Sequence, residues 1–514
     1  MKTGSRIVVN TGILYARMAI TVFISLYATR LILTALGVND FGIFNVVAGA
    51  ISMLTFLNSA MASATQRFMS YAEGAGNTQK VKSIFNVSVI LHLIIALLVL
   101  ILLEGVGYFL FDGVLKIPPA RIEVAKLIFQ FMIVSTLFTI ISVPYDAVIN
   151  THENMLLFAI LGVIEAILKL AIALYITYSA YDHLIAYGLL TAALSIVLLI
   201  VRRIYCHRKY EECEINLKKY YNRCVFNEMT GFAGWTFLGS STSMLANYGQ
   251  GVLMNFFFGT VVNAAQGISG QVSGQLGAFA VTMLKALNPI IDKSEGAGNR
   301  LLMIKAAMTG TKASFLLLIF FYIPVFIEMP YVFNIWLSNV PEYAIIFCRL
   351  LLLRNLVEQL YITISSSISA VGNIRKFQIY ASILRIIPLI ISYFLFYFKY
   401  PPHYLYLTFI AYSLAESILT IYFSNKYYDL PVMSFLKNVI GRCVLMLLVS
   451  ALLSLIPFSL MEPGFIRLMT VGMVSTLSVI VTSWYIGFNI EERNSLSQVL
   501  GSLSQKFKFK NKTL

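Results

Sequence analysis

Ionisable side chains interrupt several long apolar stretches of this chain, and four of them form two pairs spaced one helical turn apart. Glu165 and Lys169 form one pair, and Arg354 and Glu358 form the other. Residues four apart lie on one face of an α-helix, so each pair can neutralise its own charge. An unpaired charge at the centre of a bilayer costs about 2.5–3.5 kcal/mol. The spacing leaves two interpretations open: structural ion pairs, or charged groups that line a water-filled path.

Cations in and beside these apolar stretches outnumber the acidic groups. A positive excess suits an anionic substrate, because pairing with phosphate offsets the desolvation of both groups. We therefore predict a cationic substrate-binding cavity and assign candidate coupling roles, for a proton or another cation, to the acids. The predicted substrate-binding cations are Arg17, Arg30, Arg67, Lys169, Lys285, Arg349, Arg354 and Arg385. The predicted ion-coupling residues are Glu165, Glu358 and Glu416.

Uncharged polar residues form stripes at helical spacing in three of the stretches. Small and weakly polar residues are common where helices pack closely in membranes, which is one explanation. A wet cavity is the other, because amide side chains that face lipid cost free energy. Three long stripes favour the cavity. Its predicted polar lining consists of Asn45, Ser52, Asn247, Gln250, Gln271 and Gln275.

The elements that hold these residues must be helices of a membrane protein. The 514 residues are 59% hydrophobic and 12% charged, whereas soluble domains are roughly half apolar and a quarter charged. This composition excludes a soluble enzyme, a secreted domain and a disordered regulator. Hydrophobic length predicts an all-α polytopic membrane protein with about 14 transmembrane helices.

Basic residues fall mostly on one side of the predicted spans. The chain has 38 Lys and Arg against 23 Asp and Glu, a formal net charge of +15. If the chain starts in the cytoplasm, roughly 27 of these basic residues are cytoplasmic and about five lie on the opposite side. This bias predicts that both ends are cytoplasmic. The net charge then reflects topology, and we expect no nucleic-acid partner.

The chain also repeats itself. The segment 73–77, Glu-Gly-Ala-Gly-Asn, recurs 222 residues later at 295–299, and the same offset aligns Gly37 with Gly259. Six spans per copy give both copies the same orientation. We therefore expect two six-helix lobes related by a parallel pseudo-twofold repeat, plus two C-terminal helices. The predicted division is an N-terminal lobe (1–205), a cytoplasmic linker (206–228), a C-terminal lobe (229–424), helices 13 and 14 (425–488) and a basic amphipathic cytoplasmic tail (489–514).

The sequence lacks the motifs of common enzymes. There is no GxxxxGK[ST] segment for ATP hydrolysis through a P-loop, and no HExxH segment. The five cysteines form no CxxC pair and the five histidines offer no catalytic constellation. We therefore expect no enzymatic activity, no cofactor and no metal site. A membrane polymerase or glycosyltransferase stays an alternative, although the predicted external loops are short.

The first quarter of the chain resembles a known family. Residues 36–47, Leu-Gly-Val-Asn-Asp-Phe-Gly-Ile-Phe-Asn-Val-Val, are similar to the opening of Wzx-type polysaccharide flippases. So are residues 65–68, Thr-Gln-Arg-Phe, with the turn at 73–77 that follows them. This family lies in the multidrug/oligosaccharidyl-lipid/polysaccharide exporter superfamily, which also contains the MATE drug antiporters.

The resemblance implies a MATE-like fold whose two lobes alternate between inward- and outward-open states. The implied substrate is an undecaprenyl-diphosphate-linked oligosaccharide, moved across the bacterial cytoplasmic (inner) membrane for lipopolysaccharide O-antigen or capsule biosynthesis. Further implied partners are membrane lipids, H⁺ or Na⁺ as coupling ion, and other polysaccharide-assembly proteins. A MATE-like drug/cation antiporter is the alternative, although cationic drugs would favour acids with fewer competing cations. By position, the resemblance implies cavity roles for Arg17, Arg30, Arg67 and Lys285.

Overall fold

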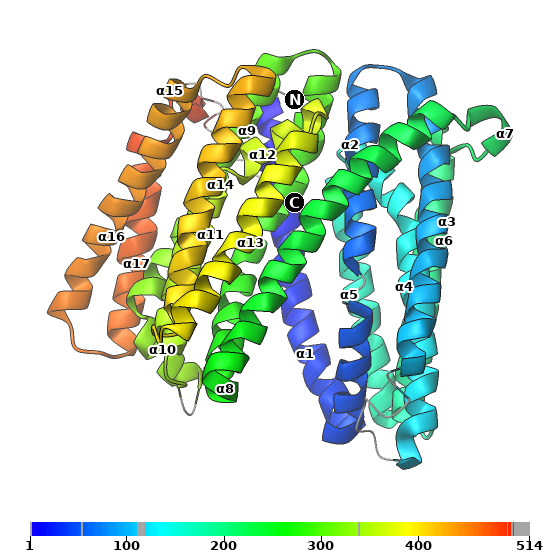
Figure 1. Cartoon of the computed structure of the whole chain (residues 1–514), viewed down its shortest axis with the longest axis horizontal. Coiled ribbons are helices and arrows are strands. Elements are labelled where there is room, and N and C mark those ends of the chain that lie inside the picture. The colour runs from blue at the N-terminus through cyan, green and yellow to red at the C-terminus, as the bar shows by residue number, and fades with distance from the viewer. Residues whose placement is uncertain are drawn as a thin grey trace, which may run out of the picture. The chain divides into compact units, whose positions relative to one another are not determined.

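The computed structural model describes residues 3–52, 55–109, 111, 119–337, 340–490, 492–494 and 497. Every regular element in these ranges is helical, which confirms the predicted all-α class. Apolar runs of this length form helices because a helix satisfies its own backbone hydrogen bonds in a medium without water. Figure 1 shows these long helices.

The chain forms its helices in the order labelled in Figure 1. In the first half they are α1 (Thr3–Ser52), α2 (Thr55–Gly74), α3 (Thr78–Phe109), η2 (Pro119–Arg121), α4 (Ile122–Thr151), α5 (Met155–Tyr178), α6 (His183–Lys209), η3 (Glu211–Cys213) and α7 (Leu217–Tyr220). In the second half they are α8 (Arg223–Gly296), α9 (Arg300–Ile327), α10 (Met329–Trp336), α11 (Ala344–Gln359), α12 (Ile362–Val371), α13 (Arg375–Tyr397), α14 (Tyr404–Tyr428), α15 (Val432–Phe435), η4 (Leu436–Gly441), α16 (Arg442–Leu460), α17 (Phe465–Thr482) and η5 (Ser483–Gly487).

Ten helices in the described ranges are long and apolar enough to cross a membrane. The other predicted spans correspond to more polar stretches: the second arm of α1 with α2, the two arms of α8, and α11 with α12. Together these make about 14 spans, as the hydrophobic lengths predict. The least apolar spans are therefore also those that carry the predicted polar stripes and the Arg354–Glu358 pair.

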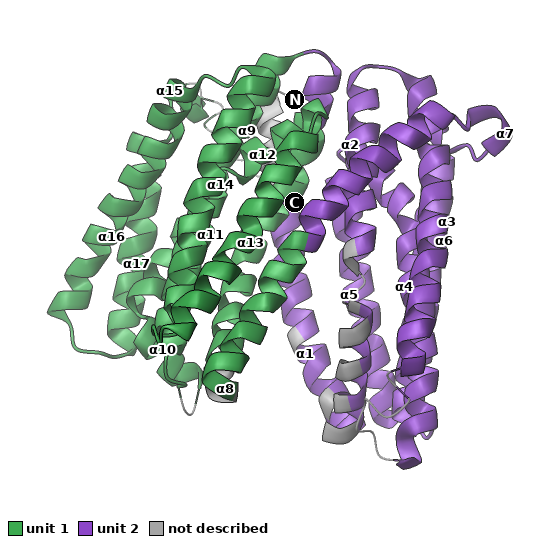
Figure 2. Ribbon diagram, in the orientation of Figure 1, with its two compact units in different colours: residues 1–11, 242–291, 299–514 green, residues 12–241, 292–298 purple. Residues whose placement is uncertain are grey.

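The chain divides into two compact units (Figure 2). The N-terminal unit consists of residues 12–241 and 292–298, and the C-terminal unit of residues 1–11, 242–291 and 299–514. The boundary at 241/242 falls inside α8, whereas the predicted linker, 206–228, lies within the N-terminal unit. The predicted helices 13 and 14, now α16 and α17, belong to the C-terminal unit.

Each unit has its own apolar core. In the N-terminal unit α4 packs against α3 and α6, and Val99, Ile128 and Leu184 are among the residues that these helices bury. In the C-terminal unit α14 packs against α11 and α13, with Phe347 and Phe409 fully buried between them. These packed helices provide the rigid positions from which polar side chains project.

Both copies of the sequence repeat interrupt a long helix at the same place. α1 leaves helical geometry at Gly37 (φ 70°, ψ 171°), and α8 does so at Gly259 (φ 78°, ψ −170°). A positive φ is costly for a residue with a Cβ, so the backbone itself requires glycine at both positions. In the described structure a Cβ at either glycine would meet nothing within 4 Å, so space is not the reason. The matching geometry confirms the internal repeat at the level of the helix interruption.

The repeated Glu-Gly-Ala-Gly-Asn turn also has the same structure in both copies. Gly76 and Gly298 take positive φ values of 68° and 71°. The side-chain oxygens of Asn77 and Asn299 each accept a hydrogen bond from the backbone N–H three residues later, at 2.9 Å and 3.1 Å. Asparagine is a preferred residue for capping a helix in this way. The turn therefore ends one helix and starts the next by the same means in both halves.

Within the N-terminal unit, which includes residues 292–298, the two copies of this turn lie against each other. A Cβ on Gly74 would fall 2.1 Å from the carbonyl oxygen of Lys293. A Cβ on Gly296 would fall 2.0 Å from the carbonyl oxygen of Tyr71. Both glycines are therefore required by close backbone approach, and the two contacts are related by the repeat.

Candidate functional site

A buried polar network lies in the C-terminal unit between α13 and α14. Arg385 Nη2 lies 2.5 Å from Glu416 Oε1, and the Glu416 side chain is only 7% exposed. Tyr361 donates its hydroxyl to Glu416 Oε2 at 2.8 Å, and Tyr412 donates to the same oxygen. Arg385 also donates to Tyr412 Oη at 2.9 Å and to Ser243 Oγ at 2.8 Å. The network thus joins two predicted site residues, Arg385 and Glu416, through direct hydrogen bonds.

Helix geometry explains how these side chains meet. Tyr412 and Glu416 are four residues apart on α14, so they lie on one face of that helix. Tyr361 stands at the break between α11 and α12, where the backbone is no longer helical (φ −124°, ψ −12°). The break allows the Tyr361 hydroxyl to reach Glu416.

A second network on α11 involves the predicted pair Arg354 and Glu358. Arg354 Nε lies 2.7 Å from Glu358 Oε1, so the contact expected from the i,i+4 spacing forms. Glu358 Oε1 also accepts from Ser413 Oγ at 3.3 Å, and the guanidinium of Arg354 lies 4.7 Å above the ring of Phe409. The side chain of Glu358 is 30% exposed, much more than that of Glu416. Of the two carboxylates, Glu358 is therefore the more accessible.

Asn355 extends the polar region from α11 to α8 and α9. Its side-chain amide donates to Ser273 Oγ at 2.9 Å and to Tyr322 Oη at 3.0 Å. Neither Asn355 nor Tyr322 was predicted from the sequence. The only available signal was that Asn355 follows Arg354 directly, which gives no partner.

In the N-terminal unit, Arg17 on α1 faces α5. Its guanidinium lies 4.5 Å above the ring of Phe158 and packs on Gly162, where a Cβ would fall 2.0 Å from Arg17 Nε. Glu165 and Asp146 are the carboxylates whose charges act on Arg17. Among the contacts that the structure describes, Arg17 forms no ion pair, so its charge is held in place by packing on an aromatic ring and a glycine.

Two ion pairs lie near this arginine. Lys169 Nζ is 2.8 Å from Glu165 Oε1, as the i,i+4 spacing predicts. Asp146 Oδ1 lies 2.9 Å from Arg202 Nε, joining α4 to α6. Asp146 and Arg202 were not predicted as a pair, because 56 positions separate them and nothing local in the sequence indicates the contact.

The other predicted cations make different contacts or are exposed. Arg67 on α2 lies over the rings of Phe68 and Phe232, at 4.7 Å and 5.3 Å. Arg349 donates to the backbone carbonyl of Phe326 at 3.2 Å. The side chains of Arg30 and Lys285 are exposed.

The residues predicted to form the polar lining differ in their exposure. Gln250 is buried and donates to the carbonyl of Ala246 at 3.1 Å. Asn247, Gln271 and Gln275 are exposed. The side chains of Asn45 and Ser52 lie outside what the structure describes. In the described ranges, no three His, Cys, Asp or Glu residues gather as the ligands of a metal ion would.

Two buried ion pairs outside the predicted site were not predicted from the sequence either. Arg467 on α17 donates to both carboxylate oxygens of Glu328, at 2.7 Å and 2.9 Å, and Glu328 is fully buried. Lys312 on α9 lies 2.5 Å from Glu492. Bidentate geometry and the complete burial of Glu328 indicate a structural role for the Arg467–Glu328 pair.

Solved structures of transporters have the same arrangement of helices. A MATE structure in the bent conformation gives a TM-score of 0.71 at 13% sequence identity, covering 86% of this chain and 100% of that one. An outward-facing multidrug resistance MATE family transporter of the MOP superfamily gives 0.71 at 13% identity, covering 84% and 96%. The chain has the MATE fold.

Other comparisons add to this MATE likeness. A MOP superfamily transporter from Pyrococcus furiosus, described as having a binding pocket of reverse polarity, gives a TM-score of 0.69 at 12% identity over 84% of this chain and 96% of its own. The MatE family model matches residues 15–175. The uncharacterized membrane protein EpsK of Bacillus subtilis (strain 168) is 29% identical over 119 residues, which is 23% of this chain and 23% of EpsK. The MATE fold is thus a multi-pass membrane architecture found in transporters.

Proposed function

We propose that the protein is a flippase that moves an undecaprenyl-diphosphate-linked oligosaccharide across a membrane by alternating access. The observation that carries the proposal is the placement of Arg354 and Arg385 in polar networks on packed helices of a MATE fold. The guanidinium fork can hold two phosphate oxygens and stays charged when buried. A lipid-linked diphosphate presents such oxygens next to an apolar chain, and therefore fits cations held at membrane depth.

The two arginines have different roles in this proposal. Glu416 is held by Arg385, Tyr361 and Tyr412 and is nearly inaccessible in this conformation, so the Arg385–Glu416 pair positions the helices here and would have to open before Glu416 could bind a coupling ion. Glu358 is more exposed, so a substrate phosphate can replace it on Arg354. Arg354 is therefore the proposed binding residue.

Three carboxylates are proposed for coupling to H⁺ or Na⁺. Glu165, Glu358 and Glu416 each contact a cation in the resting arrangement. Displacement of Glu358 from Arg354 would leave a carboxylate without its counter-charge, and such a group binds a proton or a metal cation more readily. Replacing each glutamate by glutamine would show which of them transport requires.

We further propose that the protein resides in the bacterial cytoplasmic membrane, with both ends of the chain and the linker at 206–228 in the cytoplasm. The support is the positive-inside bias, to which Arg208, Lys209, Lys218 and Lys219 contribute. Labelling of single introduced cysteines from either side of intact cells would test this orientation.

Deletion of the gene is the experiment that tests the function. Undecaprenyl-linked lipids are extracted from the deletion strain, and surface glycan is measured on the same cells. We expect a completed oligosaccharide to accumulate on its lipid carrier while surface glycan disappears, and both to return to normal with the wild-type gene. Arg354→Ala should restore export to no more than about a tenth of the wild-type level at equal protein abundance. Lys426→Ala, at the end of α14, is the matched control and should restore export fully.

Two outcomes would contradict the proposal. If lipid-linked intermediates do not accumulate and surface glycan is intact, the protein does not flip the glycan carrier. Resistance to cationic drugs on overexpression, in the same strains, would then indicate a drug/cation antiporter. If Arg354→Ala exports as well as the control variant, Arg354 does not bind the substrate.

A further inference from the structure

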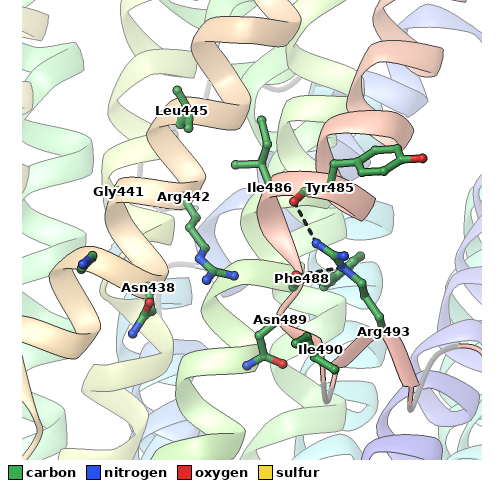
Figure 3. A pocket seen from close by; sticks show the side chains of 11 residues that line it. Asn438, Gly441, Arg442, Leu445, Tyr485, Ile486, Phe488, Asn489, Ile490 and Arg493 are labelled. Carbon is green, nitrogen blue, oxygen red and sulfur yellow. Dashed lines mark hydrogen bonds between the residues drawn. The ribbon is translucent and has the colours of Figure 1, made fainter.

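A cavity of about 790 Å³ opens beside the two C-terminal helices of the C-terminal unit. Figure 3 shows Asn438 and Arg442, from η4 and α16, on one side of it, and Tyr485, Ile486 and Arg493 on the other. These helices lie outside the repeated part of the chain. The cavity is therefore separate from the networks assigned to transport.

The walls of the cavity have an unusual backbone. Both η4 and η5 are π-helical, and both contribute lining residues. π-Helical turns are rare and occur frequently at functional sites. Gly487, at the end of η5, packs on α16 so closely that a Cβ would fall 2.5 Å from Met446 Sδ. This contact fixes the two walls at one separation.

The cavity carries positive charge without a carboxylate. Lys437, Arg442 and Arg493 line it, and none of the described residues in its lining is acidic. Arg493 is held by the backbone, donating to the carbonyls of Phe488 at 3.2 Å and Tyr485 at 2.8 Å. Among the contacts that the structure describes, Lys437 and Arg442 have no ion pair. Three cations on one cavity favour an anion.

The neighbouring carboxylate is already engaged. Glu492 lines an adjoining cavity of about 450 Å³, where it binds Lys312 at 2.5 Å and accepts from Thr309 at 3.1 Å. Arg442 also lines this adjoining cavity, but among the described contacts Glu492 forms an ion pair with Lys312 and none with Lys437 or Arg442. Asn438 and Asn489 line both cavities and add hydrogen-bond donors that an oxyanion can use.

The apolar part of the cavity determines what kind of anion fits. Leu445, Tyr485 and Ile490 line it and are 48%, 71% and 75% exposed, so the cationic end opens directly onto apolar helix surface. A free phosphate would satisfy the cations but would leave this surface uncovered. A phospholipid covers both, since its acyl chains continue from its headgroup.

We propose that this cavity is a binding site for the phosphate headgroup of an anionic phospholipid, whose acyl chains lie along α16. Basic pockets between membrane helices recognise anionic headgroups in this way. The site goes beyond the proposed flippase function, because it lies on the two helices outside the repeat and requires no transport. Bound lipid would hold α16 and α17 together at their π-helical ends.

The test uses the full-length protein in a neutral detergent. Phosphatidylglycerol or phosphatidylcholine with identical acyl chains is added, and bound lipid is counted by native mass spectrometry. We expect phosphatidylglycerol to be retained and phosphatidylcholine not. The double variant Lys437→Gln, Arg442→Gln should lower the affinity for phosphatidylglycerol roughly thirtyfold, at about 1 kcal/mol per cation. Neither residue has an ion pair among the described contacts, so the variant should fold.

A matched double variant removes two cations elsewhere on the same unit. Lys399→Gln, Lys426→Gln should bind phosphatidylglycerol as the parent does. Equal binding of the two phospholipids, or an unchanged affinity in the Lys437→Gln, Arg442→Gln variant, would overturn the proposal. So would competition by inorganic phosphate at the lipid's own binding concentration, which would indicate a site for free phosphate. None of these results depends on glycan export.

Discussion

Replacement of Arg467 by alanine would leave a buried carboxylate without its counter-charge. Glu328 is fully buried, and both of its oxygens accept hydrogen bonds from the Arg467 guanidinium, at 2.7 Å and 2.9 Å. Removal of one partner from a buried ion pair costs about 3–5 kcal/mol. We therefore expect Arg467→Ala to lower the free energy of unfolding by about 3–5 kcal/mol, since Glu328 has no other cation at this distance among the described contacts.

The loss of stability in Arg467→Ala is to be compared with the loss in Arg354→Ala. Glu358 is 30% exposed and keeps a hydrogen bond from Ser413, so water and this hydroxyl can replace part of what Arg354 supplies. We expect a loss of about 1–2 kcal/mol for Arg354→Ala. A structural arginine should thus show a large effect on stability, whereas a substrate-binding arginine should show a small one and a large effect on export.

The assay is unfolding in mixed micelles, followed by circular dichroism as the denaturing detergent is titrated. A double variant, Glu328→Met with Arg467→Met, removes both charges of this pair and should recover most of the lost stability, because an apolar replacement of a buried pair is often neutral. An Arg467→Ala protein within about 1 kcal/mol of the parent would refute the reasoning. It would mean that Glu328 does not depend on Arg467 for its place in the folded protein.

Further predictions concern local geometry and pH. Gly162→Ala should reduce export about tenfold or more, because the added Cβ would displace the Arg17 guanidinium that packs against Gly162. Export is measured by complementation of the deletion strain. The control is Gly12→Ala, since a Cβ at Gly12 meets nothing within 4 Å in the described structure. Gly259→Ala should lower the free energy of unfolding by about 1–2 kcal/mol, because the φ of Gly259 is positive. If the Gly259→Ala protein unfolds at the same detergent concentration as the Gly12→Ala protein, this prediction is wrong. Burial raises the pKa of Asp182, but a hydrogen bond from Arg121 and two backbone N–H groups outweigh it and hold that pKa below its usual range. The stability from Asp182 should therefore be present above about pH 4 and be lost as the pH falls below it, and Asp182→Asn should remove this part of the acid dependence of unfolding.

Local features of the structure could be predicted from the sequence. Hydrophobic length indicates the number of spans, and a repeated segment with glycine at matching positions indicates the two related halves. The pairs Glu165–Lys169 and Arg354–Glu358 were also predictable, because residues four apart lie about one helical turn from each other. In each case the partner lies within the same element or at a fixed offset.

Contacts between helices could not be predicted in the same way. Arg385 and Glu416 were identified singly as candidates, but nothing in the sequence indicates that they bind each other or that Tyr361 joins them. The pairing of Glu328 with Arg467 could not be predicted for the same reason, since 139 positions separate the two residues. Such partners depend on which helix faces are adjacent, and helix packing in membranes leaves several faces compatible with the same polarity pattern.

The contact between the two copies of the glycine turn has a consequence for the origin of the chain. Gly74 meets the backbone of Lys293, and Gly296 meets the backbone of Tyr71, so the two copies exchange equivalent contacts. Such a reciprocal exchange is the pattern of an isologous contact, as in a homodimer with twofold symmetry. Two identical half-length chains could make the same contact, and in such an ancestor one glycine codon would have served both sides of the axis. In a single chain the two glycines are separate positions, so a substitution at either one alone would break one of the two contacts.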